Sequence, residues 1–251
     1  MKIITINVNK GGAGKTTVAH NFAEYLAKDS RVLLMDFDDS ANLTHRYGEF
    51  DKSENTVIGL FETGKVTPVN VTAKEQKSLS LIAGHQEVEV LKERLNTRRR
   101  REYIFGKWLA ENIEQLEKDY DYMVIDTEND EGILTVNALL VSDVVLGIAE
   151  ASKDSVTALA RLREFVDDIN HDFESDIHLY FIGNKINLSE KASNDLLTAL
   201  NNFDGYLGYL PRRTLLADDV TIFNSDNPKA AETVAQVTEV FDKIKEKLEE
   251  A

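Results

Sequence analysis

Residues 9–17 read NKGGAGKTT and follow the apolar run KIITINV at 2–8. An apolar strand, a glycine-rich turn and a Lys-Thr-Thr that opens a helix form the arrangement that binds phosphate. Glycines let backbone N–H groups approach the anion, and the new helix adds unpaired N–H groups and the positive end of its dipole. We therefore predict a phosphate-binding loop in which Lys15 neutralises β- and γ-phosphate oxygens and the Thr16 hydroxyl ligates Mg²⁺. The alternative is a glycine-rich turn without a ligand, and the strand before it and the helix after it argue against that interpretation.

Strand-like and helix-like segments alternate along the 251 residues. We expect strands at 2–8, 31–36, 79–82, 121–126, 143–149, 177–183 and 206–210, and helices at 15–28, 101–118, 152–170, 189–202 and 229–250. Most strand segments are continuously apolar, which is typical of parallel strands covered on both faces. The stretch 48–78 is polar and irregular, and we expect a loop with a short helix there. Without a linker or a repeat, the sequence predicts one α/β domain over 1–251, a doubly wound, mostly parallel sheet of the P-loop NTPase type with helices on both faces.

The composition excludes several classes of protein. There is no cysteine, which excludes disulfides, thiolate metal sites and iron–sulfur clusters. No signal peptide and no apolar segment of membrane-spanning length is recognisable, so we expect a cytoplasmic protein. The formal net charge is −15, and such a chain as a whole repels DNA and anionic lipids. Any polyanion must therefore bind to a local basic patch.

The loop departs from the general Walker A pattern at its start, where Asn9 stands in the place of glycine and Lys10 adds a second lysine. The resulting KGGAGKTT at 10–17 resembles the deviant Walker A box of the ParA/MinD superfamily of P-loop ATPases. The resemblance implies ATP and Mg²⁺ as cofactors and a homodimer that forms on ATP binding. In that dimer, Lys10 would reach the partner's phosphates, where other NTPases use an arginine finger. The residues implied to contact nucleotide here are Lys10, Gly11, Gly12, Ala13, Gly14, Lys15, Thr16 and Thr17.

Two carboxylates end the second strand, in MDFDDSANLT at 35–44. The matching family stretch reads D-x-D-P-Q-x-N-x-T, so Asp36 and Asp38 match, as do Asn42 and Thr44. The resemblance implies that Asp38 positions the attacking water and that Asp36 lies on the metal side. Asp39 and Ser40 replace the family's proline and glutamine, and we expect these two residues to act as helix N-caps.

The segment YDYMVIDT at 120–127 has the form of a Walker B strand that ends in Asp126. By resemblance, Asp126 contacts Mg²⁺, usually through water. The family continues with P-P-S-x-G, whereas this chain has ENDEG at 128–132. From Gly132 onward, the sequence again matches the family pattern, which reads G…LT.NAL. The lost prolines and added carboxylates put the family's switch-like loop and its dimer contacts in question.

The segment FIGNKIN at 181–187 is similar to the guanine-binding NKxD box, but Asn187 occupies the position of its aspartate. An amide does not accept both guanine N–H groups, so the segment favours ATP, with Asn184 near the adenine as in ParA-like proteins. A simple turn residue at the end of a strand is the alternative for Asn184. YLPRRTLLADD at 209–219 resembles the family segment that lines the adenine pocket, with Pro211 and Arg212 matching.

Four consecutive arginines occur at 98–101, in NTRRRREY at 97–104. They could form a nucleic-acid patch, but the acidic helix that follows makes an intramolecular charge match the favoured alternative. Other candidates for DNA contacts are Arg161, Arg163, Arg212, Arg213 and Lys229.

Within the superfamily, the lack of cysteine excludes a nitrogenase-type iron protein, and the C-terminal tail lacks the tyrosine cluster of the autokinases. The tail's apolar stripe, Phe241, Ile244 and Leu248, carries a mixed polar face, so we expect it to pack on the sheet rather than to anchor the chain to a membrane. The resemblance is closest to small, Soj-like partition ATPases. It implies slow ATP hydrolysis, nonspecific binding of nucleoid DNA and a ParB-like centromere-binding partner. The alternative is an ATP-dependent regulator or positioning scaffold that binds protein or membrane partners without DNA.

Overall fold

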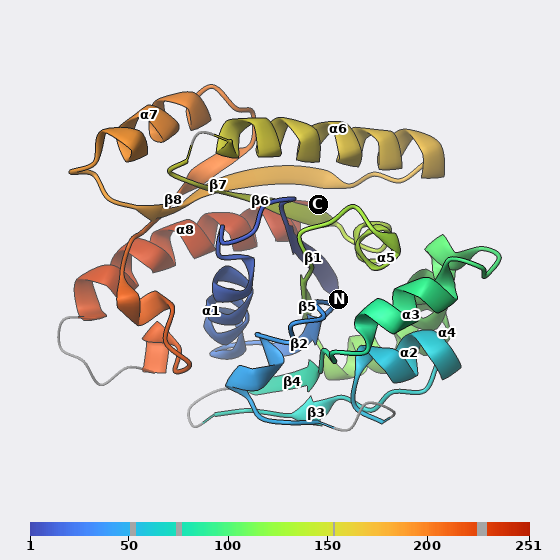
Figure 1. The fold of residues 1–251 in the computed structure, drawn as a ribbon. Helices are drawn as coiled ribbons and strands as arrows, with labels where there is room; N and C mark the ends of the chain where they lie inside the picture. Colours follow the sequence, from blue (N-terminus) through green and yellow to red (C-terminus); the bar gives the residue numbers. More distant parts are fainter. Residues whose placement is uncertain (51–53, 74–76, 153, 225–229) are drawn as a thin grey trace.

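The computed structural model describes residues 1–50, 54–73, 77–152, 154–224 and 230–251. Its elements alternate as the sequence predicts, and Figure 1 follows them along the chain. The strands are β1 (Lys2–Asn7), β2 (Arg31–Asp36), β3 (Val69–Asn70), β4 (Ser78–Ile82), β5 (Tyr122–Asp126), β6 (Val144–Glu150), β7 (His178–Ile186) and β8 (Tyr206–Pro211). The helices are α1 (Lys15–Ala27), α2 (Val57–Thr63), α3 (Val88–Leu95), α4 (Ile104–Asp119), α5 (Ile133–Leu139), α6 (Ser155–Phe173), α7 (Lys191–Leu200) and α8 (Ala230–Glu250). Short 3₁₀ turns are η1 (Thr44–Arg46), η2 (Arg101–Tyr103), η3 (Thr214–Leu216) and η4 (Ile222–Asn224).

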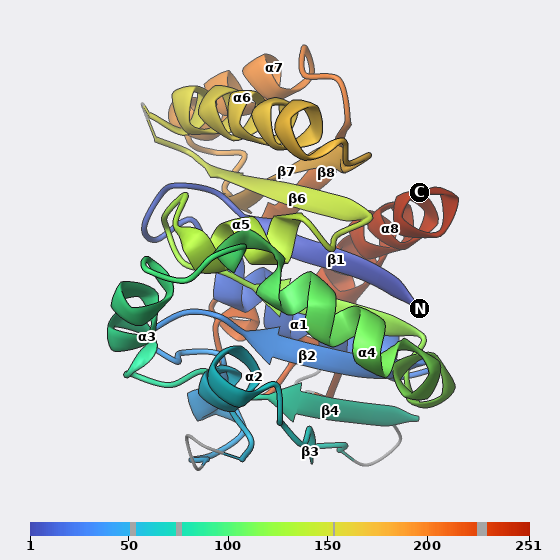
Figure 2. The same ribbon diagram turned by 90° about the vertical axis from the view of Figure 1, so that its right-hand side faces the viewer.

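The described strands form one eight-stranded sheet in the order β3-β4-β2-β5-β1-β6-β7-β8. Every neighbouring pair is parallel except β3 and β4, which are antiparallel. Helices α1 and α8 cover one face, and α4 to α7 cover the other (Figures 1 and 2). The prediction of a doubly wound, mostly parallel sheet is therefore confirmed. Because the strands are parallel, the loops after β1, β2, β5, β6, β7 and β8 meet at one edge of the sheet.

The burial of the strands explains their apolar sequences. Val32 to Asp36 of β2 and all of β5 are buried, because helices cover them on both faces. The stripe of α8 formed by Phe241, Ile244 and Leu248 is also completely buried, as predicted.

None of the helices in the described residues combines the length and the apolar composition that crossing a membrane requires.

Three parts of the chain differ from the expectation. The segment 48–78 contains α2 and the short strand β3, and β4 begins at its last residue, Ser78. Helices α3 and α5 were not predicted, because each is only two turns long and its period is hard to distinguish in sequence. The predicted helix 101–118 starts as an α-helix only at Ile104, because Arg100 has left-handed backbone dihedrals (φ 55°) and η2 follows it.

Candidate nucleotide-binding site

The loop between β1 and α1 has the backbone shape of a phosphate-binding loop. Gly14, the residue before α1, has φ 95°, and the structure gives this helix start no side-chain cap. The N–H groups of the first turn therefore remain available to an anion. A Cβ atom on Gly14 would lie within 3.0 Å of the Asn184 side chain. Both the dihedral angle and the close approach of Asn184 thus require glycine at this position.

The other predicted loop residues surround this helix start. Gly11 and Gly12 are exposed, Ala13 is buried, and Thr16 and Thr17 lie half-buried in the first turn of α1. The glycine-rich turn therefore faces solvent, while the helix behind it is anchored in the core. A ligand would reach the backbone N–H groups from this open side.

Lys15 turns toward the loop after β5. Its side chain is buried, and its Nζ donates to the Val8 carbonyl oxygen at 3.3 Å and to Asn129 Oδ1. Burial lowers the pKa of Lys15, and the nearby carboxylates, with Asp126 first, oppose this shift. Lys15 is also the first residue of α1, and an ammonium group beside a glycine-rich turn at a helix N-terminus is the arrangement that binds phosphate. Asn129 was not predicted, because it stands where the family pattern has proline.

Lys10 turns in the other direction, toward the end of β6 and the start of α6. Its Nζ lies 3.4 Å from Glu150 Oε1 and donates to the hydroxyl groups of Ser152 and Ser155, the latter at 3.0 Å. Lys185, which has φ 56°, donates to the Gly12 carbonyl oxygen and lies 3.5 Å from Glu150 Oε2. The two lysines of the loop therefore point to the two strands that flank β1.

Asp36 and Asp126 are directly opposite each other on the neighbouring strands β2 and β5. Asp36 Oδ1 accepts from the Asp38 N–H at 3.1 Å, and its Oδ2 accepts from the N–H and hydroxyl of Thr44 at 2.9 and 2.7 Å. Burial raises the pKa of Asp36 to about 6, although these hydrogen bonds oppose the shift. In this structure, Asp36 therefore organises the loop after β2.

Asp126 differs, because the residue is completely buried and neither of its carboxylate oxygens accepts a hydrogen bond from the residues that the structure describes. Burial raises its pKa well above the ordinary value, the adjacent Asp36 raises it further, and the nearby Thr16 hydroxyl and Lys15 ammonium oppose the shift. Buried carboxylates are normally paired or bound to a metal. Two free carboxylate oxygens beside a threonine hydroxyl are the oxygen ligands that Mg²⁺ prefers. The residues Thr16 and Asp126 therefore fit a magnesium ion.

Asp38 lies half-buried beyond Asp36, and its Oδ1 accepts from the N–H of Ser40 at 2.9 Å and from the Ser40 hydroxyl. The expected N-caps are wrong, because no helix of the described residues begins at Asp39 or Ser40. These two residues form a tight turn that Asp38 closes. A side chain that bonds its own backbone two residues on competes with helix formation.

The loop ENDEG is held by Lys92 of α3. Its Nζ contacts Glu128 and lies 3.1 Å from Asp130 Oδ2 and 2.8 Å from Glu89 Oε1. Glu128 Oε1 also accepts from the Asp39 N–H at 3.1 Å. Burial raises the pKa of Glu128 to about 7, although Lys92 opposes the shift. In this chain, Lys92 and its carboxylates hold the loop in which the family pattern has two prolines.

The predicted base-binding residues lie at the ends of β7 and β8. Asn184 Nδ2 donates to the Ala13 carbonyl oxygen at 2.8 Å, so the buried Asn184 side chain holds the backbone of the phosphate loop. Asn187 lies before α7, where its Oδ1 accepts from Ser189. Arg212, next to Pro211, is exposed and pairs with Glu190 at 2.9 Å. The ends of β7 and β8 that carry these residues are therefore close in the fold.

The basic candidates are dispersed over the surface. Arg163 lies over the rings of Phe181 and Phe203, and Arg213 donates to the Arg212 carbonyl oxygen. Arg161 is exposed, and Lys229 lies outside the described residues. In the described part of the chain, the run 98–101 makes a single ion pair, Arg101 with the adjacent Glu102 at 3.0 Å. The expected charge match with the acidic helix is therefore wrong.

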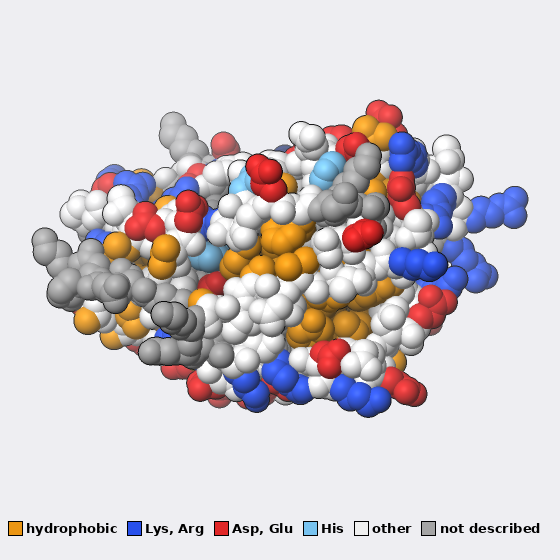
Figure 3. Space-filling model, turned by 90° about the horizontal axis from the view of Figure 1, so that it is seen from below, with side chains coloured by type: hydrophobic (Ala, Val, Ile, Leu, Met, Phe, Trp, Pro, Cys, Tyr) orange, Lys and Arg blue, Asp and Glu red, His pale blue; other side chains and the backbone are white. Residues whose placement is uncertain are grey.

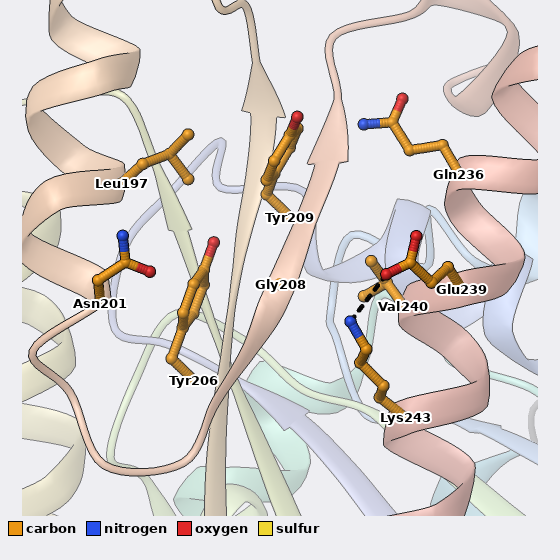
Figure 4. Close-up of a pocket in the computed structure, with 9 residues that line it drawn as sticks. All are labelled: Leu197, Asn201, Tyr206, Gly208, Tyr209, Gln236, Glu239, Val240 and Lys243. Carbon is orange, nitrogen blue, oxygen red and sulfur yellow. Dashed lines mark hydrogen bonds and ion pairs between the residues drawn. The ribbon is translucent and has the colours of Figure 1, made fainter.

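A separate hollow lies between α7, β8 and α8 (Figure 4). It has a volume of about 350 Å³. Tyr206 and Tyr209 of β8 project into it, and the ion pair between Glu239 and Lys243 lies at the α8 side. None of the predicted nucleotide-site residues lines it. The hollow therefore does not belong to the phosphate loop.

The phosphate loop at the end of β1 and the aspartates at the ends of β2 and β5 define a P-loop domain of the doubly wound class. Residues 1–179 match the family AAA_31, described as an AAA domain, and the chain belongs to this family. The sporulation initiation inhibitor protein Soj of Bacillus subtilis is 29% identical over 179 residues, 70% of this chain and 69% of Soj. The ParA/MinD-type identity expected from the Walker A box is thereby confirmed.

Solved structures share the fold over nearly the whole chain. A putative plasmid partition protein of Borrelia burgdorferi, bound to AMPPNP, has a TM-score of 0.81 and 24% identity and covers 98% of each chain. Cobyrinic acid a,c-diamide synthase of Mycobacterium smegmatis, with a bound ATP analogue and magnesium, has a TM-score of 0.72 and 24% identity over 86% of this chain and 89% of that chain. At this level of identity, both similarities concern the fold.

Proposed function

We propose that residues 1–251 form one domain that binds MgATP, dimerises when ATP is bound, and hydrolyses ATP slowly in the partition or positioning of a cellular cargo. Soj and the Borrelia partition protein support this class of role. The observation that carries the proposal is the divergence of Lys10 and Lys15, which reach toward opposite neighbours of β1. Lys15 would thus bind the nucleotide of its own subunit, and Lys10 would remain available for the nucleotide of the partner.

The nucleotide would lie along the open side of the loop from Gly11 to Thr17. Its phosphates would replace Asn129 as the partner of Lys15, because a triphosphate offers a stronger acceptor than an amide oxygen. Mg²⁺ would be held by Thr16 and Asp126, with Asp36 behind them. When bound, the ion would neutralise negative charge on the phosphates. The adenine would lie toward Asn184, Pro211 and Arg212.

Hydrolysis requires a group that orients water on the γ-phosphate. Asp38 follows the buried strand β2 and remains half-exposed at the mouth of the site, so it is our candidate. In the dimer, Lys10 would leave Glu150 and neutralise charge on the partner's phosphates. Stabilisation of developing charge by a residue supplied in trans is worth several orders of magnitude in rate in related phosphoryl transfer.

For the cargo, we propose nonspecific nucleoid DNA and a ParB-like centromere-binding partner that stimulates hydrolysis. The net charge of −15 counts against DNA binding, which leaves a second candidate, an ATPase regulator or positioning scaffold that acts on protein or membrane partners without DNA binding. Binding to unrelated duplex DNA at rising salt, with and without ATP, separates the two. A DNA-binding dimer requires nucleotide and loses affinity steeply with salt. Absence of ATP-dependent binding at low salt supports the scaffold.

Sedimentation or light scattering with ADP, ATP and a nonhydrolysable analogue tests the dimer. The parent protein should dimerise with ATP and the analogue and stay monomeric with ADP. Lys10→Ala should still bind ATP but remain monomeric, whereas Lys15→Ala should lose ATP binding itself. Lys243→Ala on α8 serves as the control lysine. ATP-dependent dimerisation of Lys10→Ala at the parent's ATP concentration would contradict the role in trans.

A further inference from the structure

The surface between α3 and α4 carries a basic hollow that the nucleotide site does not use. Arg98, Arg99, Arg100, Tyr103, Ile104 and Lys107 line it, and its volume is about 850 Å³. We propose that this arginine groove, defined by these six residues, binds the phosphate backbone of duplex DNA. The proposal rests on the proposed function, to which it adds the surface that contacts DNA. Lys and Arg side chains gather at the right-hand end of the molecule in Figure 3, on the side where Figure 1 shows α3 and α4.

The cations of the groove are free to bind an external anion. Within the described residues, Arg99 and Arg100 are exposed and make neither an ion pair nor a side-chain hydrogen bond. Arg98 donates from Nη1 to the Phe61 carbonyl oxygen at 2.6 Å, which fixes its guanidinium without neutralising it. Lys107 lies 3.6 Å from Glu111, but both side chains are largely exposed and such a pair is weak.

The loop that presents these cations is held in place from the core. Asn137 of α5 is completely buried, and its side chain donates to the Arg101 carbonyl oxygen at 2.8 Å and accepts from the Phe105 N–H at 2.9 Å. Arg100 has φ 55°, a conformation that glycine or asparagine adopts more easily. The backbone next to the arginines is therefore fixed at Arg101 and Phe105 before DNA binds. This segment loses little conformational freedom when the guanidinium groups contact phosphate.

The chemistry of the groove favours phosphodiesters over an acidic protein segment. Residues 98–107 contain five Lys or Arg and a single Glu, in a chain of net charge −15. Protein partners are anchored mainly by aromatic and arginine side chains in well-packed, desolvated pockets, whereas Arg99 and Arg100 are exposed and Tyr103 is 50% exposed. Contacts to the backbone of DNA depend on cationic side chains and need no apolar anchor. Because salt screens charges beyond about 8 Å under physiological conditions, the acidic remainder of the chain does not cancel this local attraction.

The groove also lies at the edge of the sheet where nucleotide would bind. Helix α4 leads into the start of β5, so the first turn of α4 lies at the edge where β5 ends and Asp126 is found. Asn137 belongs to α5, which begins directly after the ENDEG loop, and its side chain donates to the Arg101 carbonyl oxygen. A dimer joined through the phosphate loops would bring two arginine grooves into one assembly, which raises the effective affinity for a single duplex.

Fluorescence anisotropy with a labelled duplex of random sequence, in the presence of ATP, tests the assignment. The double variant Arg99→Gln/Arg100→Gln should bind DNA about tenfold more weakly, and the slope of log affinity against log salt should become less steep by about 1.8. The matched control, Lys243→Gln/Lys245→Gln on α8, removes the same charge from two side chains that pair with Glu239 and Glu249. The control should bind DNA as the parent does.

Light scattering with ATP and the rate of ATP hydrolysis are measured on the same proteins, and both should be unchanged in the double variant. If the parent dimerises and binds DNA but the double variant binds it with equal affinity and slope, the groove assignment is wrong and the proposed function stands. If the parent dimerises but binds no DNA, the DNA part of the proposed function fails together with the groove. Binding of labelled poly-glutamate with the affinity of DNA, lost in the double variant, would assign the groove to acidic protein segments and overturn our proposal.

Discussion

Substitution of Glu150 by glutamine should make ATP-dependent dimerisation easier. In the structure, Glu150 Oε1 lies 3.4 Å from Lys10 Nζ and its Oε2 lies 3.5 Å from Lys185 Nζ. Lys10 must leave this contact before it reaches a partner's phosphate. Glutamine keeps the size of the side chain and a hydrogen-bonding group but removes the charge. The variant therefore weakens the contact that holds Lys10 while Lys15 and Thr16 keep their surroundings.

The magnitude follows from the exposure of the pair. The Lys10 and Glu150 side chains are 18% and 24% exposed. Their Coulomb energy is about 5 kcal/mol at an effective dielectric constant of about 20, but the net value after desolvation and screening is about 1 kcal/mol. Two lysines are released in each dimer, which gives about 2 kcal/mol in total. The dimerisation constant of Glu150→Gln with ATP should thus rise about 30-fold.

Sedimentation velocity over a range of protein concentrations with a nonhydrolysable ATP analogue measures this constant. Glu239→Gln on α8, which loses an ion pair of 2.9 Å with Lys243 far from the loop, is the control and should behave as the parent does. The nucleotide affinity of the monomer should be unchanged in both variants. A dimerisation constant that stays the same or falls in Glu150→Gln would refute the idea that Glu150 restrains Lys10.

Two further predictions concern stability. Gly14→Ala should destabilise the protein to urea by about 1–3 kcal/mol more than Gly64→Ala, because both glycines have positive φ but only the first would place its Cβ against Asn184. The pKa of Asp36 is raised to about 6 in the folded protein, and that of Asp126 is raised well above its ordinary value. The folded state therefore binds more protons than the unfolded state. In the absence of nucleotide, the free energy of unfolding should thus fall as the pH rises from about 4 through 6 and above. Asp126→Asn should flatten this pH profile, stabilise the ligand-free protein at pH 7 by about 1–2 kcal/mol and abolish stabilisation by MgATP. A profile of Asp126→Asn parallel to that of the parent would contradict the origin we assign to the pH dependence.

Much of the fold was predictable because its strands are buried on both faces. Continuous apolar runs such as 31–36 coincide with β2, and 121–126 differs from β5 by one residue. The C-terminal end of β7 was harder to predict. The strand continues to Ile186 through Asn184 and Lys185, whereas these two residues are typical of a turn in the sequence. Local polarity suggested a strand end, whereas pairing with β6 and β8 extends the strand.

In the site, the motifs predicted the positions of Lys15, Thr16 and Asp126, since each is defined by its place at the end of a strand or the start of a helix. The same motifs did not predict Glu150 and Asn129, which hold Lys10 and Lys15. These contacts depend on the order β5-β1-β6 in the sheet, which brings residues more than 110 positions apart to the two sides of one loop. No short pattern in the sequence records that order. The roles of the site residues in binding and hydrolysis stay predictions until the variants are measured.

The paired carboxylates at the ends of β2 and β5 have a consequence for the lifetime of the protein. Ionisation of two carboxyl groups that face each other in the interior costs stability and favours opened conformations, which proteases cleave. A divalent cation and nucleotide at Asp126 would oppose that opening by mass action. Turnover should therefore be fastest when the cell is depleted of nucleotide, and the amount of protein should follow the energy supply.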